Sequence, residues 1–288
     1  MKKHLIIDGN NLVHRAYWIS NNNNAADHVF ITLRSLKSYV EQFKPDEIWC
    51  AWDMRLSREP ALRKKLDVNY KQTRDTEYNQ QVHTETDLIV ECFGKLGVKN
   101  IFPTRGEADD IIFWLTKEKE GKKTIVSADT DFYQLISEDT SVFSPTKKIL
   151  YNTEVFLETF GFVPEKYPLY KSITGDKADN IVGLDKIGPK RALQIIKGET
   201  MLNEEQEVQV LENMRLIDLD NTGQSEWDEE YETYSRQSLN TLPIDFDGFL
   251  NICEERGFRT IINQQTIWHN AFCIKTVMAN IISELFST

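Results

Sequence analysis

The sequence predicts an α/β fold with a mostly parallel central sheet, followed by a helical region. Two observations support this fold class. Short apolar runs, several of which end in an acidic residue, alternate with amphipathic segments through about residue 150. After that point helical patterns dominate. Because alternating strands and helices build parallel sheets with right-handed crossovers, we expect an α/β core over residues 1–150 and a helical region over 151–288.

The first two predicted strands each end in an aspartate. An apolar run at residues 5–7 leads into Asp8, and a strand that begins at residue 47 leads into Asp53, with an amphipathic helix expected at 27–43 between them. A parallel crossover places both aspartates at one edge of the sheet, where open α/β sheets keep their sites. An aspartate that only caps a turn is the simpler alternative for either residue alone.

A dense group of acids lies near the middle of the chain. Its members are Glu107, Asp109, Asp110, Asp129 and Asp131. The first three begin a predicted helix, and the last two follow a predicted strand. Like charges at this density repel one another unless a cation lies between them. Oxygen ligands without nearby His or Cys favour Mg²⁺ or Mn²⁺ over zinc; solvated charges at element ends are the alternative.

Residues 55–74 are strongly basic. The basic side chains are Arg55, Arg58, Arg63, Lys64, Lys65, Lys71 and Arg74. Tyr70 lies beside Lys71, and a basic segment that carries an aromatic ring suits a nucleic-acid backbone with a base stacked on the ring. A solvated loop is the alternative. The position directly after Asp53 favours the nucleic-acid interpretation.

The helical region contributes two further acids and a candidate phosphate-binding turn. Asp176 and Asp179 are three residues apart in a Gly-containing segment. Residues 187–192 combine a glycine turn, a proline at the first helical position, and the cations Lys190 and Arg191. Exposed N–H groups at such a helix start bind phosphate. A plain connection between two helices is the alternative.

The net charge of −11 is concentrated in one segment. Residues 199–240 hold twelve acidic and two basic side chains, so the rest of the chain sums to −1 although it includes every candidate metal ligand. Once metal ions compensate those ligands, the remaining surface is basic and can bind phosphate. Within the acidic segment we expect a helix around 208–217 and then a polar loop over 221–231.

Composition excludes several other classes of protein. No apolar run approaches the length of a membrane span, and the run at 5–7 is too short for a signal-peptide core. We therefore expect a cytoplasmic protein with no membrane partner. The cysteines have no metal-site spacing and are expected to be reduced thiols: Cys50, Cys92, Cys253 and Cys273.

Seven segments resemble, in order, the motifs of the 5′-nuclease superfamily, which includes flap endonucleases, the 5′-nuclease domain of bacterial DNA polymerase I, and phage 5′-exonuclease and ribonuclease H enzymes. They are LIIDGNNLVHRAY from Leu5, AWD ending at Asp53, YKQTR from Tyr70, RGEADD from Arg105, SADTDFYQL from Ser127, TGDKADNIVGL from Thr174 and IGPKRAL from Ile187. They span roughly residues 5–197. The length and the segment 212–218 resemble a stand-alone phage-type member, which would lie in the host cytoplasm.

The resemblance implies a PIN-like nuclease core with a helical arch at about 55–80 and a duplex-binding helix–turn–helix at about 175–197. It implies a two-metal phosphodiester hydrolase that uses two Mg²⁺ ions, for which Mn²⁺ can substitute. Nine carboxylates match the family's metal site: Asp8, Asp53, Glu107, Asp109, Asp110, Asp129, Asp131, Asp176 and Asp179. Asp8, Asp53 and Asp109 would serve mainly one ion. Asp129, Asp131 and the pair at 176 and 179 would serve the other, some of them through water.

The resemblance also implies roles for the basic residues. Lys71 and Arg74 match arch residues that contact the scissile phosphate and offset developing charge, and Tyr70 matches a position that stacks on the substrate. The implied catalytic set is Lys71, Arg74, Asp8, Asp53, Asp109, Asp129 and Asp131. The implied nucleic-acid contacts are Tyr70, Lys71, Arg74, Arg55, Arg58, Lys64, Lys65, Gly183, Gly188, Lys190 and Arg191. Lys186 departs from the family, which usually has glycine there, so the turn and any monovalent ion bound to it are in question.

The implied function is a structure-specific, metal-dependent 5′-nuclease of DNA replication or repair. It would act as a 5′-3′ exonuclease and flap endonuclease on 5′ flaps, nicks and duplex ends, and would also remove RNA primers from RNA–DNA hybrids. A monomer is expected, with a single-strand-binding or clamp protein as a partner. Two alternatives are weaker. An inactive junction-binding relative should lack carboxylates or the arch lysine, and an aspartyl-phosphate phosphatase should carry its acid pair after the first strand.

Overall fold

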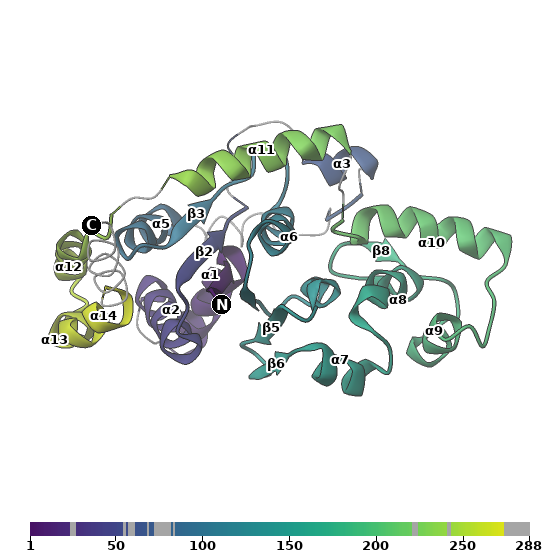
Figure 1. The fold of residues 1–288 in the computed structure, drawn as a ribbon, viewed down its shortest axis with the longest axis horizontal. Helices are drawn as coiled ribbons and strands as arrows, with labels where there is room; N and C mark the ends of the chain where they lie inside the picture. Colours follow the sequence, from purple (N-terminus) through teal and green to yellow (C-terminus); the bar gives the residue numbers. More distant parts are fainter. Residues whose placement is uncertain are drawn as a thin grey trace.

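A six-stranded sheet forms the centre of the computed structural model (Figure 1). The structure describes residues 1–23, 27–53, 56, 61–67, 69–71, 82, 84–220, 224–240 and 243–273. The strands are β1 (Lys3–Asp8), β2 (Glu47–Ala51), β3 (Lys99–Ile101), β4 (Lys122–Val126), β5 (Thr140–Ser144) and β6 (Ile149–Tyr151). Their order is β3-β2-β1-β4-β5-β6, and only the edge strand β6 pairs antiparallel. The predicted α/β fold with a mostly parallel sheet is confirmed.

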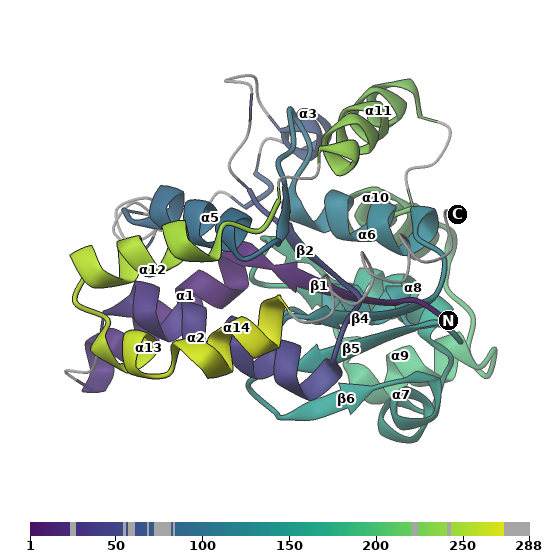
Figure 2. The ribbon, with the colours of Figure 1, turned by 60° about the vertical axis from the view of Figure 1, so that its left-hand side comes forward.

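Helices cover both faces of this sheet (Figure 2). One face carries α1 (Gly9–Asn23), α2 (His28–Phe43), α5 (Thr86–Lys95), α12 (Phe246–Glu255), α13 (Arg259–Asn263) and α14 (Gln265–Phe272). The other carries α6 (Ala108–Glu118), η1 (Asp131–Leu135), α7 (Thr153–Phe160), η2 (Pro164–Lys166), α8 (Tyr167–Thr174), α9 (Pro189–Ile196), α10 (Glu204–Ile217) and α11 (Ser225–Leu239). The last helices of the chain therefore return to the face that the first helices cover. The division into an α/β core and a helical region near residue 150 stays a prediction.

The strands separate two hydrophobic cores. Leu5 and Ile7 point into one core and Ile6 into the other, because successive side chains of a strand alternate between faces. All three are fully buried. Strands that are apolar on both faces are typical of parallel sheets covered by helices. Burial of each such side chain stabilises the fold by roughly 1.5–3 kcal/mol, so β1 is anchored firmly where it delivers Asp8 to the sheet edge.

The segment predicted as a polar loop at 221–231 is instead helical from Ser225, and this prediction was wrong. Helix α11 buries Trp227, Glu230, Tyr234 and Ser238, which are spaced for one helical face. Two of these four positions are polar, so the pattern lacks the apolar stripe by which an amphipathic helix is recognised. Residues 221–223 lie outside the described part of the chain.

Only part of the predicted arch at 55–80 is described. Within it lies a short helix, α3 (Leu62–Leu66), which Figures 1 and 2 both place next to α11. Arg55, Arg58 and Arg74 lie outside the described residues. Among the described helices, none has both the length and the apolar character that a membrane crossing requires. All four cysteines are buried and free, as expected.

Candidate active site

The predicted acids meet at the edge of the sheet where the parallel strands end. Asp8 is the last residue of β1, and Asp53 follows the end of β2. Asp129 follows β4, and Asp131 begins η1. Asp109 lies in the first turn of α6, where the helix dipole favours negative charge. The crossover geometry predicted from strand-end acids is thus what brings these side chains together.

Asp8, Asp53 and Asp109 are named here the strand-end group. Asp8 is 6% exposed; its Oδ1 accepts the backbone N–H of Asn11 at 3.0 Å and its Oδ2 accepts the hydroxyl of Ser127 at 2.7 Å. The pKa of Asp8 is raised to about 7, chiefly by burial and also by the charges of Asp129 and Asp53, while the two hydrogen bonds oppose the shift. Asp8 is therefore a carboxylate oriented by neutral donors, which suits a metal ion that prefers oxygen ligands.

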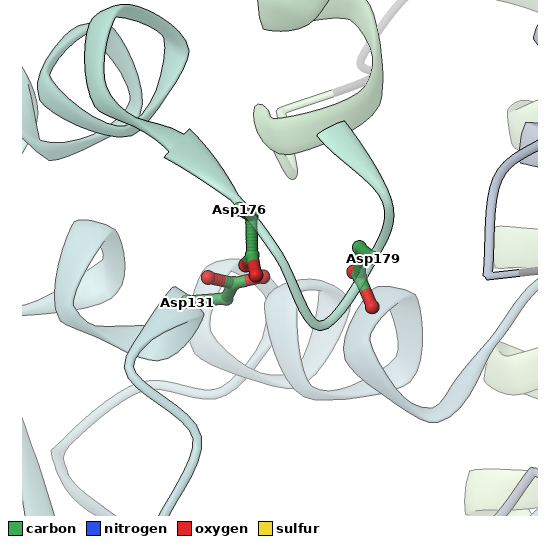
Figure 3. Close-up of side chains that lie close together, drawn as sticks. All are labelled: Asp131, Asp176 and Asp179. Atoms are coloured by element: carbon green, nitrogen blue, oxygen red, sulfur yellow. The ribbon is translucent and has the colours of Figure 1, made fainter. Parts of the chain in front are cut away.

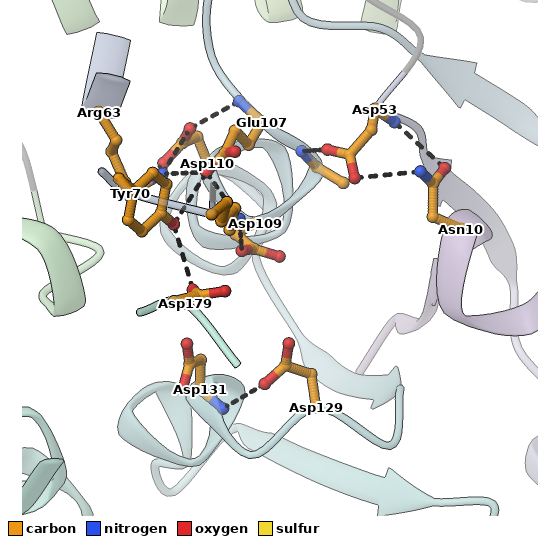
Figure 4. Close-up of polar contacts among 12 residues, drawn as sticks. Asn10, Asp53, Arg63, Tyr70, Glu107, Asp109, Asp110, Asp129, Asp131 and Asp179 are labelled. Carbon is orange, nitrogen blue, oxygen red and sulfur yellow. Dashed lines mark hydrogen bonds and ion pairs between the residues drawn. The ribbon is translucent and has the colours of Figure 1, made fainter. Parts of the chain in front are cut away.

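Asp53 connects the end of β2 to the start of α6 (Figure 4). Its Oδ1 accepts the backbone N–H of Ala108 at 2.7 Å, and its Oδ2 accepts the side-chain amide of Asn10 at 3.0 Å. Asp109 follows Ala108 directly, so this hydrogen bond sets two acids beside each other. Burial raises the pKa of Asp109, Lys71 opposes this shift, and Asp129 reinforces it.

Asp131, Asp176 and Asp179 are named here the hairpin group, because two of them lie on the hairpin of β7 (Gly175–Asp176) and β8 (Ile181–Val182). Their carboxylate oxygens lie within 4.8 Å of one another, and Figure 3 shows Asp131 directly beside Asp176. Asp129 acts electrostatically on both groups, because its charge raises the pKa of Asp8, Asp109 and Asp131. Three clustered carboxylates, with no His or Cys beside them among the described residues, fit Mg²⁺ or Mn²⁺.

Lys171, a buried lysine of α8, lies beside the hairpin group and was not predicted from the sequence. Its Nζ contacts both Asp131 and Asp176. Burial would lower the pKa of Lys171, but the charges of these two aspartates raise it above its usual value. The same contacts lower the pKa of Asp176, although burial opposes this. The available signal was a lysine five residues before the candidate ligand Asp176.

Lys71, the predicted arch lysine, lies among the acids. Its Nζ is 3.0 Å from Glu107 Oε2 and 3.8 Å from Asp109 Oδ2. Burial would lower the pKa of Lys71, but Glu107 and then other neighbours, Asp109 included, raise it well above its usual value. Lys71 therefore presents a charged ammonium group to the strand-end group from the arch side.

Asp110 differs from its predicted role as a metal ligand. It is fully buried, and its two oxygens accept a bidentate pair of hydrogen bonds from Arg63 at 2.6 and 3.0 Å. Its Oδ2 also accepts the backbone N–H of Glu107 at 2.8 Å. Both oxygens are therefore committed within the protein, because Arg63 of α3 packs onto the start of α6. Asp110 supports the site from behind instead of facing it.

Tyr70 also differs from its predicted role in base stacking. Its side chain is 3% exposed and packs with Ile181 and Ile217. The hydroxyl lies 3.2 Å from Glu107 Oε2 and 3.3 Å from Asp179 Oδ2 (Figure 4). In this conformation the ring is not available to a base. It instead links the arch to the acids.

The predicted duplex-binding turn is a tight hairpin between α8 and α9. A Cβ at Gly183 would lie 2.4 Å from the backbone of Thr174, so only glycine fits there. Gly188 caps α9, and Lys190 and Arg191 are exposed on its first turn. Lys186 has a φ of +57°, a conformation that costs a non-glycine residue about 1 kcal/mol.

The remaining predicted nucleic-acid contacts are the arch lysines. Lys65 Nζ lies 2.9 Å from Glu226 Oε1 of α11, and Lys64 is exposed. The arch therefore meets the acidic helix as well as the acid site.

The fold and this oxygen-rich edge define the class of the 5′-nucleases. Residues 3–161 match the family of the 5′-3′ exonuclease N-terminal, resolvase-like domain. The chain is 31% identical over 211 residues to a 5′-3′ exonuclease of Bacillus subtilis strain 168, covering 71% of this chain and 68% of that one. The chain therefore belongs to the 5′-3′ exonuclease family.

Solved structures show the same fold. The D15 protein of bacteriophage T5, co-crystallised with metal ions, matches with a TM-score of 0.66 at 20% identity, over 82% of this chain and 100% of that one. The T5 D15 flap endonuclease in a pseudo-enzyme–product complex with DNA and metal ions matches with a TM-score of 0.63 at 19% identity, over 83% of this chain and 100% of that one.

Proposed function

We propose that this chain is a structure-specific 5′-nuclease that hydrolyses phosphodiester bonds as a 5′-3′ exonuclease and flap endonuclease, and that it also removes RNA primers. Family membership supports the class of reaction. The observation that carries the proposal is the convergence of buried acids on one sheet edge, where neutral hydrogen-bond donors hold both oxygens of Asp8. Such an edge is a site for metal ions in contact with a phosphate.

The strand-end group, with Glu107, is proposed to hold one Mg²⁺ ion. The hairpin group, with Asp129, is proposed to hold a second, and Mn²⁺ can take either place. Bound metal ions of this kind generate a hydroxide nucleophile and stabilise the leaving oxygen. Asp8 and Asp53 support this proposal, because neutral hydrogen-bond donors of the protein already orient both carboxylates.

The two buried lysines are proposed to act on the phosphate. Lys71 and Lys171 are both charged and both contact carboxylates of the site. With those carboxylates engaged as metal ligands, each ammonium group would turn toward the scissile phosphate and offset the negative charge that develops there. Arg74 is proposed to assist Lys71 from the arch.

The hairpin and the start of α9 are proposed to grip duplex DNA. The exposed cations Lys190 and Arg191 follow Gly188 at the start of α9, a few residues after the tight turn at Gly183. The basic residues Arg55, Arg58, Lys64 and Lys65 are proposed to guide the 5′ strand. The proposed substrates are 5′ flaps, nicks, duplex ends and RNA–DNA hybrids, met by a cytoplasmic monomer that works with a single-strand-binding or clamp protein.

Cleavage of labelled substrates tests this function. Duplexes with a 5′ flap, a nick or an RNA primer are incubated with the chain and either Mg²⁺ or a chelator. We expect products from the 5′ end with Mg²⁺ and none with chelator. Cleavage that needs no metal, or no cleavage of any of these substrates, would contradict the proposal.

A further inference from the structure

Helix α11 lies along the segment that leads into the metal-site residue Glu107. Figure 1 shows it running above α6 from the side of β3 to α3, and Figure 2 also places it beside α3. Gln237 forms two hydrogen bonds with the backbone of Phe102, accepting its N–H at 2.9 Å and donating to its carbonyl at 2.7 Å. No motif of the sequence explained this helix, which is part of the most acidic segment of the chain.

Glu230 forms the central contact of α11. It is 2% exposed, and its carboxylate accepts the backbone N–H of Thr104 at 2.9 Å and that of Arg105 at 2.7 Å. It also accepts the hydroxyl of Tyr234 at 3.1 Å. A buried carboxylate that satisfies two consecutive backbone donors fixes the path of that backbone, because charge-assisted hydrogen bonds are short and strong.

The same helix presses on the next residue of the segment. A Cβ on Gly106 would lie 2.4 Å from Tyr234 Oη and 3.3 Å from Glu230 Oε2. Gly106 immediately precedes Glu107, and α6 with Asp109 follows. The buried face of α11 therefore sets the position of the backbone that carries Glu107 and Asp109.

A second contact connects α11 to Arg63 and Asp110. The Arg63 guanidinium lies 5.1 Å from the ring centroid of Trp227, and Trp227 is 4% exposed. Arg63 in turn holds both oxygens of Asp110, whose Oδ2 accepts the N–H of Glu107. Glu230 holds the backbone before Glu107, and Trp227 holds the arginine that fixes the turn after it.

We propose that Glu230 is a positioning residue of the nuclease site, which acts through the backbone of residues 104–106 to aim Glu107 and the start of α6 at the first metal ion. The inference rests on the proposed function, because it concerns a metal ion bound by the strand-end group. Glu230 itself touches neither metal nor substrate. Its effect is on the affinity of the site for metal, as expected of a partner that orients a ligand.

Glu230→Gln tests this role, because glutamine keeps the shape but offers only one acceptor oxygen to the two N–H groups. Mn²⁺ binding to the full chain, measured by electron paramagnetic resonance without substrate, should weaken by about tenfold. Cleavage should need correspondingly more metal and should recover at high metal concentration, with KM for the DNA unchanged. Glu232→Gln is the matched control, since Glu232 is exposed on the same helix and should leave Mn²⁺ affinity unchanged.

Tyr234→Phe provides an independent variant if Glu230→Gln does not fold. It keeps the ring but removes the hydroxyl that donates to Glu230. We expect Mn²⁺ affinity to fall by about threefold, less than in Glu230→Gln, because both backbone N–H groups keep their carboxylate acceptor. Unchanged Mn²⁺ affinity in folded Glu230→Gln, or in Tyr234→Phe where the first variant is unfolded, would overturn the inference. Failure of the wild-type chain to cleave DNA would instead count against the proposed function.

Discussion

The two groups of carboxylates at the sheet edge are held in different ways. In the strand-end group, Asp8 and Asp53 accept hydrogen bonds from neutral protein donors on both oxygens. In the hairpin group, Asp131 and Asp176 face the ammonium of Lys171. The first group is therefore oriented before any metal ion binds, whereas the second is held together by a cation of the protein. At the first group a metal ion would meet Asp8 and Asp53 already oriented, with Lys71 in contact with Asp109 and the neighbouring Glu107. At the second group it would have to displace Lys171 from two of the three acids.

The largest expected effect concerns pH and the strand-end group. Because the pKa of Asp8 is raised from 3.8 to about 7, the folded state binds this proton more tightly than the unfolded chain does. Without metal, the stabilisation from protonated Asp8 is therefore fully present below about pH 4 and is lost as the pH rises through 7. The free energy of unfolding falls by on the order of 4 kcal/mol at most. Thermal unfolding of the protein in the presence of a chelator, across this pH range, measures the loss of stability.

Asp8→Asn is the control for the pH effect, since asparagine cannot ionise. The variant should show a smaller fall in Tm between pH 4 and 7 than the wild type. Saturating Mg²⁺ should stabilise the wild type more at pH 7 than at pH 5, because the ion favours the ionised carboxylate. If Tm depends on pH in the same way for the two proteins in chelator, the ionisation of Asp8 does not cause the loss of stability.

The next effect concerns the hairpin group. Lys171→Met removes the ammonium and leaves Asp131 and Asp176 facing each other, which should destabilise the metal-free protein by about 3 kcal/mol. Mg²⁺ can then bind without displacing Lys171, so the rise in Tm on adding Mg²⁺ should be larger than in the wild type. Differential scanning calorimetry with and without Mg²⁺ measures both. Lys177→Met, an exposed lysine of the same hairpin, is the control.

A Tm rise with Mg²⁺ that is the same in Lys171→Met as in the wild type would show that the lysine and the metal ion do not compete. The distinction between the two groups would then be lost, although the cleavage reaction itself would remain possible.

The smallest effect tests how far hydrogen bonds orient the strand-end group. Ser127 donates its hydroxyl to Asp8 and accepts the backbone N–H of Asp129. Ser127→Ala removes both hydrogen bonds, and loss of the one to Asp8 corresponds to about 1 kcal/mol or roughly fivefold in Mn²⁺ affinity. Titration of the variant with Mn²⁺ measures it, and Ser141→Ala on the neighbouring strand is the matched control. Equal affinities for the Ser127→Ala and wild-type chains would show that orientation contributes nothing to binding.

The sheet and most of the acid site could be predicted from the sequence because their signals are local. Apolar runs that end in Asp8 and Asp53 predict strands and a shared edge from a few residues each. The seven ordered motifs predicted the family, which the match over residues 3–161 confirms. These features depend on chain periodicity and order, and neither requires knowledge of which side chains pack together.

The contacts that depend on packing could not be predicted. Asp110 looks like any other acid of its cluster, and only the position of Arg63, 47 residues away, shows that it is an ion-pair partner. Lys171 reaches Asp131 across 40 residues. Tyr70 is buried by residues of the helical region, which its basic neighbours do not indicate. Charge type is local information, whereas the identity of the partner is set by the tertiary fold.

Helix α11 shows a second limit. Its buried face carries Glu230 and Ser238 where an amphipathic pattern would have apolar residues. The polar positions exist because this face satisfies backbone donors of the active-site segment as well as covering a core. A helix that positions a site is therefore harder to recognise than one that only fills space.

The number of Mn²⁺ ions bound by the chain tests the account most directly. Electron paramagnetic resonance titration of the wild type without substrate should reveal two ions per chain, the weaker of which competes with Lys171. Asp176→Asn should lose the weaker ion and keep the tighter one at the strand-end group. A single ion in the wild type, or the loss of both ions together in the variant, would contradict the existence of two distinct carboxylate groups.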